Sequence, residues 1–136
     1  MNRKIKIEFL FLVLTQGIHS LEEYNGRLWE VFPPATFLSK TVSENPEKGF
    51  LFINIGLFIF GFSYWLFLMT KQYLVYRSIL WIWIVIEIIN GIGHPVWTLI
   101  ERSYTPGVIT APILFVIAVY LAKLLLSSHE EKQFSE

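Results

Sequence analysis

Apolar residues gather in four long segments of this chain, and polar residues separate them. The segments cover about residues 5–24, 50–70, 78–97 and 108–126. A transmembrane α-helix needs about 20 mostly apolar residues, so each segment is long enough to cross a bilayer. The pattern predicts an all-α fold, a bundle of four transmembrane helices that makes residues 1–126 a single domain. The polar residues 127–136 predict a solvated C-terminal tail.

The stretch between the first two segments, residues 25–49, mixes apolar and helix-breaking residues. Pro33-Pro34 and Asn45-Pro46 interrupt regular structure, while Trp29 and Phe37 are large apolar side chains. Aromatic side chains beside a span are typical of the lipid headgroup level. We therefore expect an interfacial loop or short helix between the first and second spans, which acts either as an anchor or as a lid over a site.

The composition supports an integral membrane protein and excludes several other classes. Of all residues, 54% are hydrophobic and the mean hydropathy is +0.51, above the usual range of soluble domains. Eleven basic residues balance 11 acidic ones, so no basic surface for nucleic acid is expected. The chain has no cysteine, which excludes thiolate metal sites and cysteine nucleophiles.

The start of the chain is basic and precedes the first apolar segment. That segment ends in His19, Leu21 and two glutamates rather than in a small-x-small cleavage site, so we expect a retained first helix. Basic residues are more numerous on the side of the N-terminus, and the positive-inside rule therefore predicts a multi-pass protein with both termini cytoplasmic. The residues on that side are Arg3, Lys4, Lys6, Lys71, Arg77, Lys123 and Lys132, against Arg27, Lys40, Lys48 and Arg102 on the other.

Ionisable residues lie inside the apolar segments or at their ends. A charge at membrane depth costs about 2.5 to 3.5 kcal/mol on insertion scales, so a chain rarely keeps one without a use or a partner. The first and third segments each carry a polar set whose spacings of three, four or seven place it on one helix face. The sets are His19, Glu22 and Glu23, and Glu87, Asn90 and His94.

Both sets are expected at one depth. Successive spans run in opposite directions, so the ends of the first and third segments lie beside the starts of the second and fourth. Asn54 and Thr110 belong to those starts. The sequence therefore predicts a closed polar pocket, whichever side of the membrane is cytoplasmic.

Three chemistries suit these residues. Iron, zinc or manganese would accept imidazole and carboxylate ligands, and the candidate ligands are His19, Glu22, Glu23 and His94. Metal-free acid–base catalysis would pair a buried glutamate with a histidine. A proton or ion relay would use the same residue types. Two interpretations involve no chemistry: the first set as solvated residues at a helix end, and the second as a hydrogen-bond clamp between helices.

Short motifs connect these residues with a known family. His19-Ser20-Leu21-Glu22-Glu23 reads H-x-x-E-E, His94 is a second histidine, and Tyr104-Thr105-Pro106-Gly107 reads Y-x-P-G. With four apolar segments around them, the chain resembles the HXXEE-motif family of integral membrane proteins, whose function is unknown. The resemblance implies as marked residues His19, Glu22, Glu23, His94, Tyr104, Pro106 and Gly107.

The Y-x-P-G segment predicts a tight turn, with proline at its second position and a glycine of positive φ at its third. That turn would bring the Tyr104 hydroxyl over the pocket.

The sequence favours a metal-dependent enzyme that acts on a lipid or isoprenoid-like substrate through an intramembrane His/Glu site. The alternatives are a metal-free isomerase of an apolar substrate and a non-enzymatic transporter, ion relay or lipid-binding protein. Membrane lipids and an apolar small molecule are the expected partners, nucleic acid is not, and a homodimer is compatible with the small surface that four helices bury. Catalytic candidates are Glu22, Glu23, Glu87 and Tyr104, and supporting candidates are Asn54, Asn90, Pro106 and Gly107.

Overall fold

The structure, a computed structural model, describes the backbone of residues 3–70 and 77–133 and the side chains of residues 3–68 and 77–128. Over these residues it is all-α, with no strand. The helices are α1 (Arg3–Asn25), α2 (Leu28–Val31), α3 (Pro33–Val42), α4 (Pro46–Thr70), α5 (Arg77–Glu101) and α6 (Ala111–Gln133).

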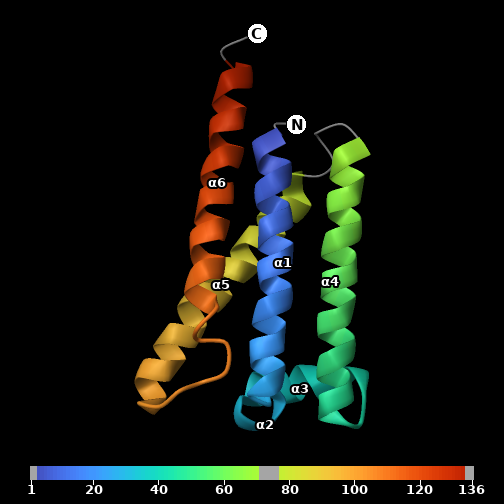
Figure 1. The fold of residues 1–136 in the computed structure, drawn as a ribbon, viewed down its shortest axis with the longest axis vertical. Coiled ribbons are helices and arrows are strands. Elements are labelled where there is room, and N and C mark those ends of the chain that lie inside the picture. The colour runs from blue at the N-terminus through green and yellow to red at the C-terminus, as the bar shows by residue number, and fades with distance from the viewer. Residues whose placement is uncertain (1–2, 71–76, 134–136) are drawn as a thin grey trace.

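Three of the long helices, α1, α4 and α6, stand side by side, and α5 crosses them obliquely (Figure 1). In this arrangement α1 packs against both α4 and α6, and α5 packs against α6. The short helices α2 and α3 close the end of the bundle where α1 finishes and α4 begins. The predicted all-α bundle is therefore confirmed in its general form.

Among the described residues, three helices are long and apolar enough to cross a membrane, not the four expected. They cover Pro46–Leu68, Arg77–Glu101 and Ala111–Ser128. The predicted first span, residues 5–24, is helical in α1 but falls short of this standard. Its uncharged stretch, residues 9–21, is bounded by Glu8 and Glu22, and it is shorter than the roughly 20 apolar residues that a span needs.

Helix ends differ from the apolar segments where polar residues continue a helix. Residues 127–133, expected in a polar tail, are the last turns of α6, while residues 134–136 lie outside the described part. Glutamate, lysine and glutamine are good helix formers, so the helix continues past the apolar segment. Hydropathy marks where a helix leaves an apolar environment rather than where it ends.

The main apolar core fills the half of the bundle in which α1 begins. Phe9 of α1 is fully buried there and meets Tyr64 and Trp83 edge to edge, at ring-centroid distances of 5.6 and 5.7 Å. Leu114 and Leu121 of α6 complete this cluster. The polar residues of the expected site lie in the other half, nearer α2 and α3.

The segment between α1 and α4 is folded rather than open. α3 begins with Pro33 at its first turn, where a missing N–H costs no hydrogen bond. Leu28 and Trp29 of α2 pack with Phe50 of α4 in a second, smaller apolar cluster. At Gly49 a side chain would collide with the Ser39 backbone, so glycine permits the close approach of α3 and α4.

Candidate functional site

Two histidines and one glutamate meet at the centre of the site. The Nε2 atoms of His19 and His94 lie 3.3 and 3.2 Å from the same carboxylate oxygen, Oε1 of Glu23. One ligand atom from each of the three residues falls within 4.8 Å of the others. All three are buried, and His19 is fully inaccessible. The structure thus brings together three of the four predicted metal ligands.

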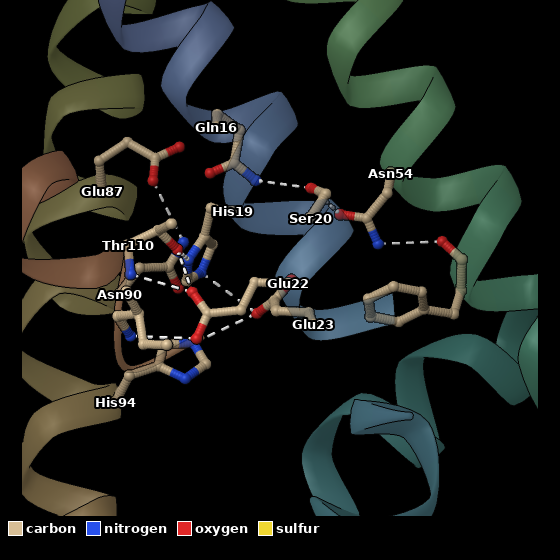
Figure 2. Close-up of polar contacts among 12 residues, drawn as sticks. Gln16, His19, Ser20, Glu22, Glu23, Asn54, Glu87, Asn90, His94 and Thr110 are labelled. Atoms are coloured by element: carbon tan, nitrogen blue, oxygen red, sulfur yellow. Dashed lines mark hydrogen bonds and ion pairs between the residues drawn. The ribbon is translucent and has the colours of Figure 1, made fainter. Parts of the chain in front are cut away.

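Helix spacing and one helix crossing produce this meeting. His19 and Glu23 are one turn apart on α1, so their side chains share a face. His94 reaches them from α5, which confirms the prediction that the polar sets of the first and third segments face each other (Figure 2). The two imidazole rings meet edge to face, with centroids 4.8 Å apart.

Glu22, the fourth predicted ligand, turns away from this group toward the segment between α5 and α6. Its Oε1 accepts hydrogen bonds from the Tyr104 hydroxyl and the Ile109 backbone N–H, both at 3.0 Å. Its Oε2 accepts from the backbone N–H and the hydroxyl of Thr110, at 2.9 and 2.6 Å. Four donors therefore occupy the two oxygens, and Glu22 ties α1 to the start of α6.

Thr110 links Glu22 to His19 and thereby fixes which ring nitrogen carries the proton of a neutral imidazole. A threonine hydroxyl has one proton, which Thr110 donates to Glu22 because an ionised carboxylate only accepts. At 2.7 Å the Thr110 oxygen must then accept from Nδ1–H of His19. In a neutral imidazole Nε2 is left with a lone pair. That atom is buried near Glu23 and forms no hydrogen bond.

The segment after α5 contains the predicted tight turn. Val108 N–H donates to the Thr105 carbonyl at 3.3 Å, which leaves Pro106 and Gly107 in the middle of the turn, and φ of Gly107 is +92°. A Cβ at Gly107 would lie only 2.6 to 2.8 Å from ring atoms of His94 and His19. The turn is confirmed, and its glycine lies directly against both imidazoles.

Tyr104 is placed differently from the expectation that it lies over the pocket. Its side chain is 58% exposed, its hydroxyl contacts Glu22, and it is not among the residues that line the cavity described below. Partial burial, followed by the hydrogen bond to the Glu22 carboxylate, raises the pKa of Tyr104 above its ordinary value. Tyr104 therefore supports the turn, and Pro106 packs on Gly26 beside it.

A second polar group surrounds Glu87, which lies on the same face of α5 as His94 and about two turns before it. The Asn90 amide donates to Glu87 at 3.2 Å. Gln16 of α1 lies on its other side, and with the amide nitrogen turned toward the carboxylate it donates to both oxygens, at 2.9 and 3.0 Å. Figure 2 draws the opposite amide orientation, in which Gln16 donates to Ser20.

Asn54 of α4 ends this network. Ser20 donates to its carbonyl oxygen at 2.7 Å, and its amide donates to the Phe50 carbonyl at 3.0 Å. Gln16 and Ser20 belong to the site although neither was predicted from the sequence. Their spacing was the available signal, because Gln16 lies three residues before His19 and Ser20 lies four residues after Gln16, on the polar end of α1.

A cavity of about 450 Å³ adjoins both polar groups. Apolar side chains of α3, α4 and α5 form most of its wall, and Glu23, Glu87 and His94 reach it from one side. Its volume lies within the range of about 300 to 1,000 Å³ that is usual for small-molecule sites. The site thus combines a buried His/Glu/His group with space for a mostly apolar ligand.

The comparisons with known proteins agree with the sequence motifs. A family model described as "Protein of unknown function with HXXEE motif" matches residues 9–122, which include every residue of the site. None of the curated proteins matches the chain, and none of the solved structures does.

Proposed function

The chain belongs to the HXXEE-motif family of unknown function, and we propose that it is a membrane enzyme that binds one divalent metal through His19, Glu23 and His94. The adjoining cavity would hold an apolar substrate within reach of that metal.

The protonation of His19 carries this proposal. With Nδ1–H donated to Thr110, the lone pair of Nε2 is directed at a carboxylate oxygen 3.3 Å away. Two acceptors so close repel each other unless a proton or a metal cation lies between them. His94 approaches the same oxygen, and one proton cannot bridge Glu23 to both rings, whereas a metal ion can bind all three.

The donor set fits such an ion, and so do the two separations from Glu23, while the widest separation among the three ligand atoms, 4.8 Å, would have to shorten when a metal binds. Two ligands at about 2.0 to 2.2 Å from a tetrahedral metal lie about 3.3 to 3.6 Å apart, close to the observed separations from Glu23. Three protein ligands leave one position open, as in catalytic zinc sites. Iron and manganese also accept two imidazoles and a carboxylate.

The surrounding residues support the ligands as outer hydrogen-bond partners do in metal enzymes. A metal-binding histidine usually donates its other N–H to an oxygen, which fixes the ring. Thr110 and Glu22 supply that partner for His19. The bound metal would supply Lewis-acid chemistry and an activated water. Glu87, on the same cavity, is the residue that we assign to proton transfer with the substrate.

We also propose that α1 completes a four-helix transmembrane bundle. It lies between α4 and α6, so its polar end faces protein rather than lipid. Among the described residues, Arg3, Lys4, Lys6, Arg77 and Lys123 lie toward one end of the bundle, which supports a cytoplasmic location for that end. Lys71 and the side chain of Lys132 lie outside the described part of the chain.

One observation favours a second candidate, a metal-free acid–base enzyme. Glu87 is 2% exposed, lines the cavity and has amide partners but no described basic side chain beside it. A buried carboxyl at a substrate cavity is suited to proton transfer. In this alternative His19 and His94 would share protons with Glu23.

Elemental mass spectrometry of detergent-purified protein, prepared without chelators, tests the metal proposal. Wild type should contain about one equivalent of iron, zinc or manganese. The variants His19→Ala and His94→Ala should lose it, while His129→Ala, which changes the third histidine of the sequence, should keep it. Wild-type protein without metal, or folded His19→Ala and His94→Ala proteins that retain it, would refute the proposal.

A further inference from the structure

The cavity lies between α4 and α5, two helices that separate toward the end where α2 and α3 lie (Figure 1). Its floor is formed by α3, through residues such as Ala35 and Ser39, and its polar side by Glu87 and its neighbours. The remaining wall is almost wholly apolar. This form suits a ligand with a long apolar part and one small polar head.

The rim of the cavity is made of side chains that face outward. Leu57 and Phe60 on α4, and Ile82 and Ile86 on α5, line the cavity and are each 40 to 59% exposed. In a bilayer these residues would contact lipid chains. A ligand dissolved in the membrane would therefore enter sideways between α4 and α5 without passing through water.

The charges on the wall restrict the head group. Two carboxylates, Glu23 and Glu87, line the cavity, and none of its described lining residues is lysine or arginine. Phosphate and carboxylate groups are usually bound by arginine or lysine. An anionic head would instead face like charges in a medium of low dielectric constant, where repulsion is strong.

The hydrogen-bonding groups restrict it further. Glu87 accepts from Asn90 and Gln16, and both donors are neutral amides. A carboxylate has about four lone-pair positions, so Glu87 can accept further hydrogen bonds from a ligand. The polar wall therefore complements a head that donates hydrogen bonds.

We propose that the cavity binds a single-chain amphiphile whose head donates hydrogen bonds and carries no negative charge, such as a long-chain amine or alcohol. As the identity of a substrate, this inference rests on the proposed function. As a statement about binding, it concerns the protein without a bound metal, because a divalent cation would offset the negative charge of Glu23.

Quenching of tryptophan fluorescence tests this directly, because Trp83 lines the cavity. Four amphiphiles with the same brominated chain but amine, alcohol, carboxylate or phosphate heads would be titrated into protein in uncharged detergent micelles. The amine and the alcohol should quench at about tenfold lower concentration than the two anions, the ratio expected from one charge-assisted hydrogen bond. The variant Trp83→Phe, which should lose most of the quenching, identifies the responding residue.

Two further variants separate the cavity from general partitioning. Ala35→Phe adds a ring at the cavity floor and should weaken quenching by the amine, whereas Gly56→Phe, where an added Cβ meets no atom within 4 Å, should not. Glu87→Gln should reduce the preference for amine over phosphate. Equal binding of all four heads, tighter binding of the anions, or unchanged quenching in folded Ala35→Phe protein would overturn the inference.

The same titration on metal-analysed samples keeps the two proposals distinct. Selective binding of the amine or alcohol to protein that contains no metal would support the cavity ligand and refute the metal centre. Stoichiometric metal in the purified protein, with no selective binding after a chelator has removed that metal, would support the metal centre and refute the cavity ligand.

Discussion

Glu22 and Glu23 are adjacent in sequence, yet their carboxylates serve different parts of the molecule. Glu22 accepts four hydrogen bonds from the segment that precedes α6, while Glu23 lies between the imidazoles of His19 and His94. Consecutive residues on a helix point about 100° apart, which explains the division. Of the two glutamates in the motif, Glu22 therefore holds α1 to the segment before α6, and Glu23 is the proposed metal ligand.

Replacing the two glutamates one at a time should separate these roles. Glu23→Gln should remove bound metal with little loss of helicity, whereas Glu22→Gln should keep most of the metal but lower the free energy of unfolding by about 1 to 3 kcal/mol, through loss of charged hydrogen bonds. Metal analysis and denaturation followed by circular dichroism measure the two effects. Equal metal loss in both variants would contradict the division.

Thr110 should affect metal affinity without being a ligand. Thr110→Val removes the oxygen that accepts from His19 and should weaken metal binding by about 10- to 100-fold, as loss of outer partners does elsewhere. Thr110→Ser keeps the hydroxyl and serves as the matched control. Competition with a chelator measures the affinities, and the idea fails if valine and serine behave alike.

Gly107 should tolerate no side chain. Gly107→Ala places a Cβ within 2.8 Å of both imidazoles at a positive φ, so we expect a loss of about 1 to 3 kcal/mol in unfolding free energy, together with weaker metal binding. Gly56→Ala meets nothing within 4 Å and should leave both unchanged or slightly raise stability. Similar stability of the two variants would argue against the observed packing.

The phenol of Tyr104 should ionise at higher pH than an ordinary tyrosine. Partial burial and then the hydrogen bond to Glu22 raise its pKa, and the stabilisation that this bond gives at neutral pH is lost as the pH rises through the elevated pKa. The difference in phenolate absorbance between wild type and Tyr104→Phe isolates this residue. A midpoint at or below the ordinary value of about 10 would disagree with the hydrogen bond.

The absence of cysteine makes the membrane topology easy to test. Glu44→Cys lies between α3 and α4, and Ser127→Cys lies near the end of α6, both at exposed positions. In intact cells an impermeant thiol reagent should label Glu44→Cys and leave Ser127→Cys unmodified until the membrane is permeabilised. Labelling of both from one side would exclude the proposed arrangement.

Much of the site could be predicted because spacing and depth are visible in sequence. His19, Glu23 and His94 meet as the alternating directions of the helices imply, and Thr110 and Asn54 lie near them. The turn at Gly107 also followed from residue type alone.

Other features depend on rotation about the helix axes and on tertiary packing. No local pattern told Glu22 from Glu23, because their difference arises from where the segment before α6 docks. Gln16 and Ser20 gained a role only when α4 and α5 approached α1. Residues 5–24 were predicted to span the membrane because their apolar residues were counted without regard to the charged residues that flank them.

The polar end of α1 depends on residues that are synthesised much later. Thr110 follows His19 by 91 residues, and His94 also lies far beyond His19 in the sequence. During biogenesis, α1 emerges from the ribosome with His19 and Glu23 and lacks both partners until α5 and α6 follow. The polar end of α1 can therefore complete its contacts only after α5 and the residues before α6 have been made, which couples the packing of the first helix to the synthesis of the later part of the chain.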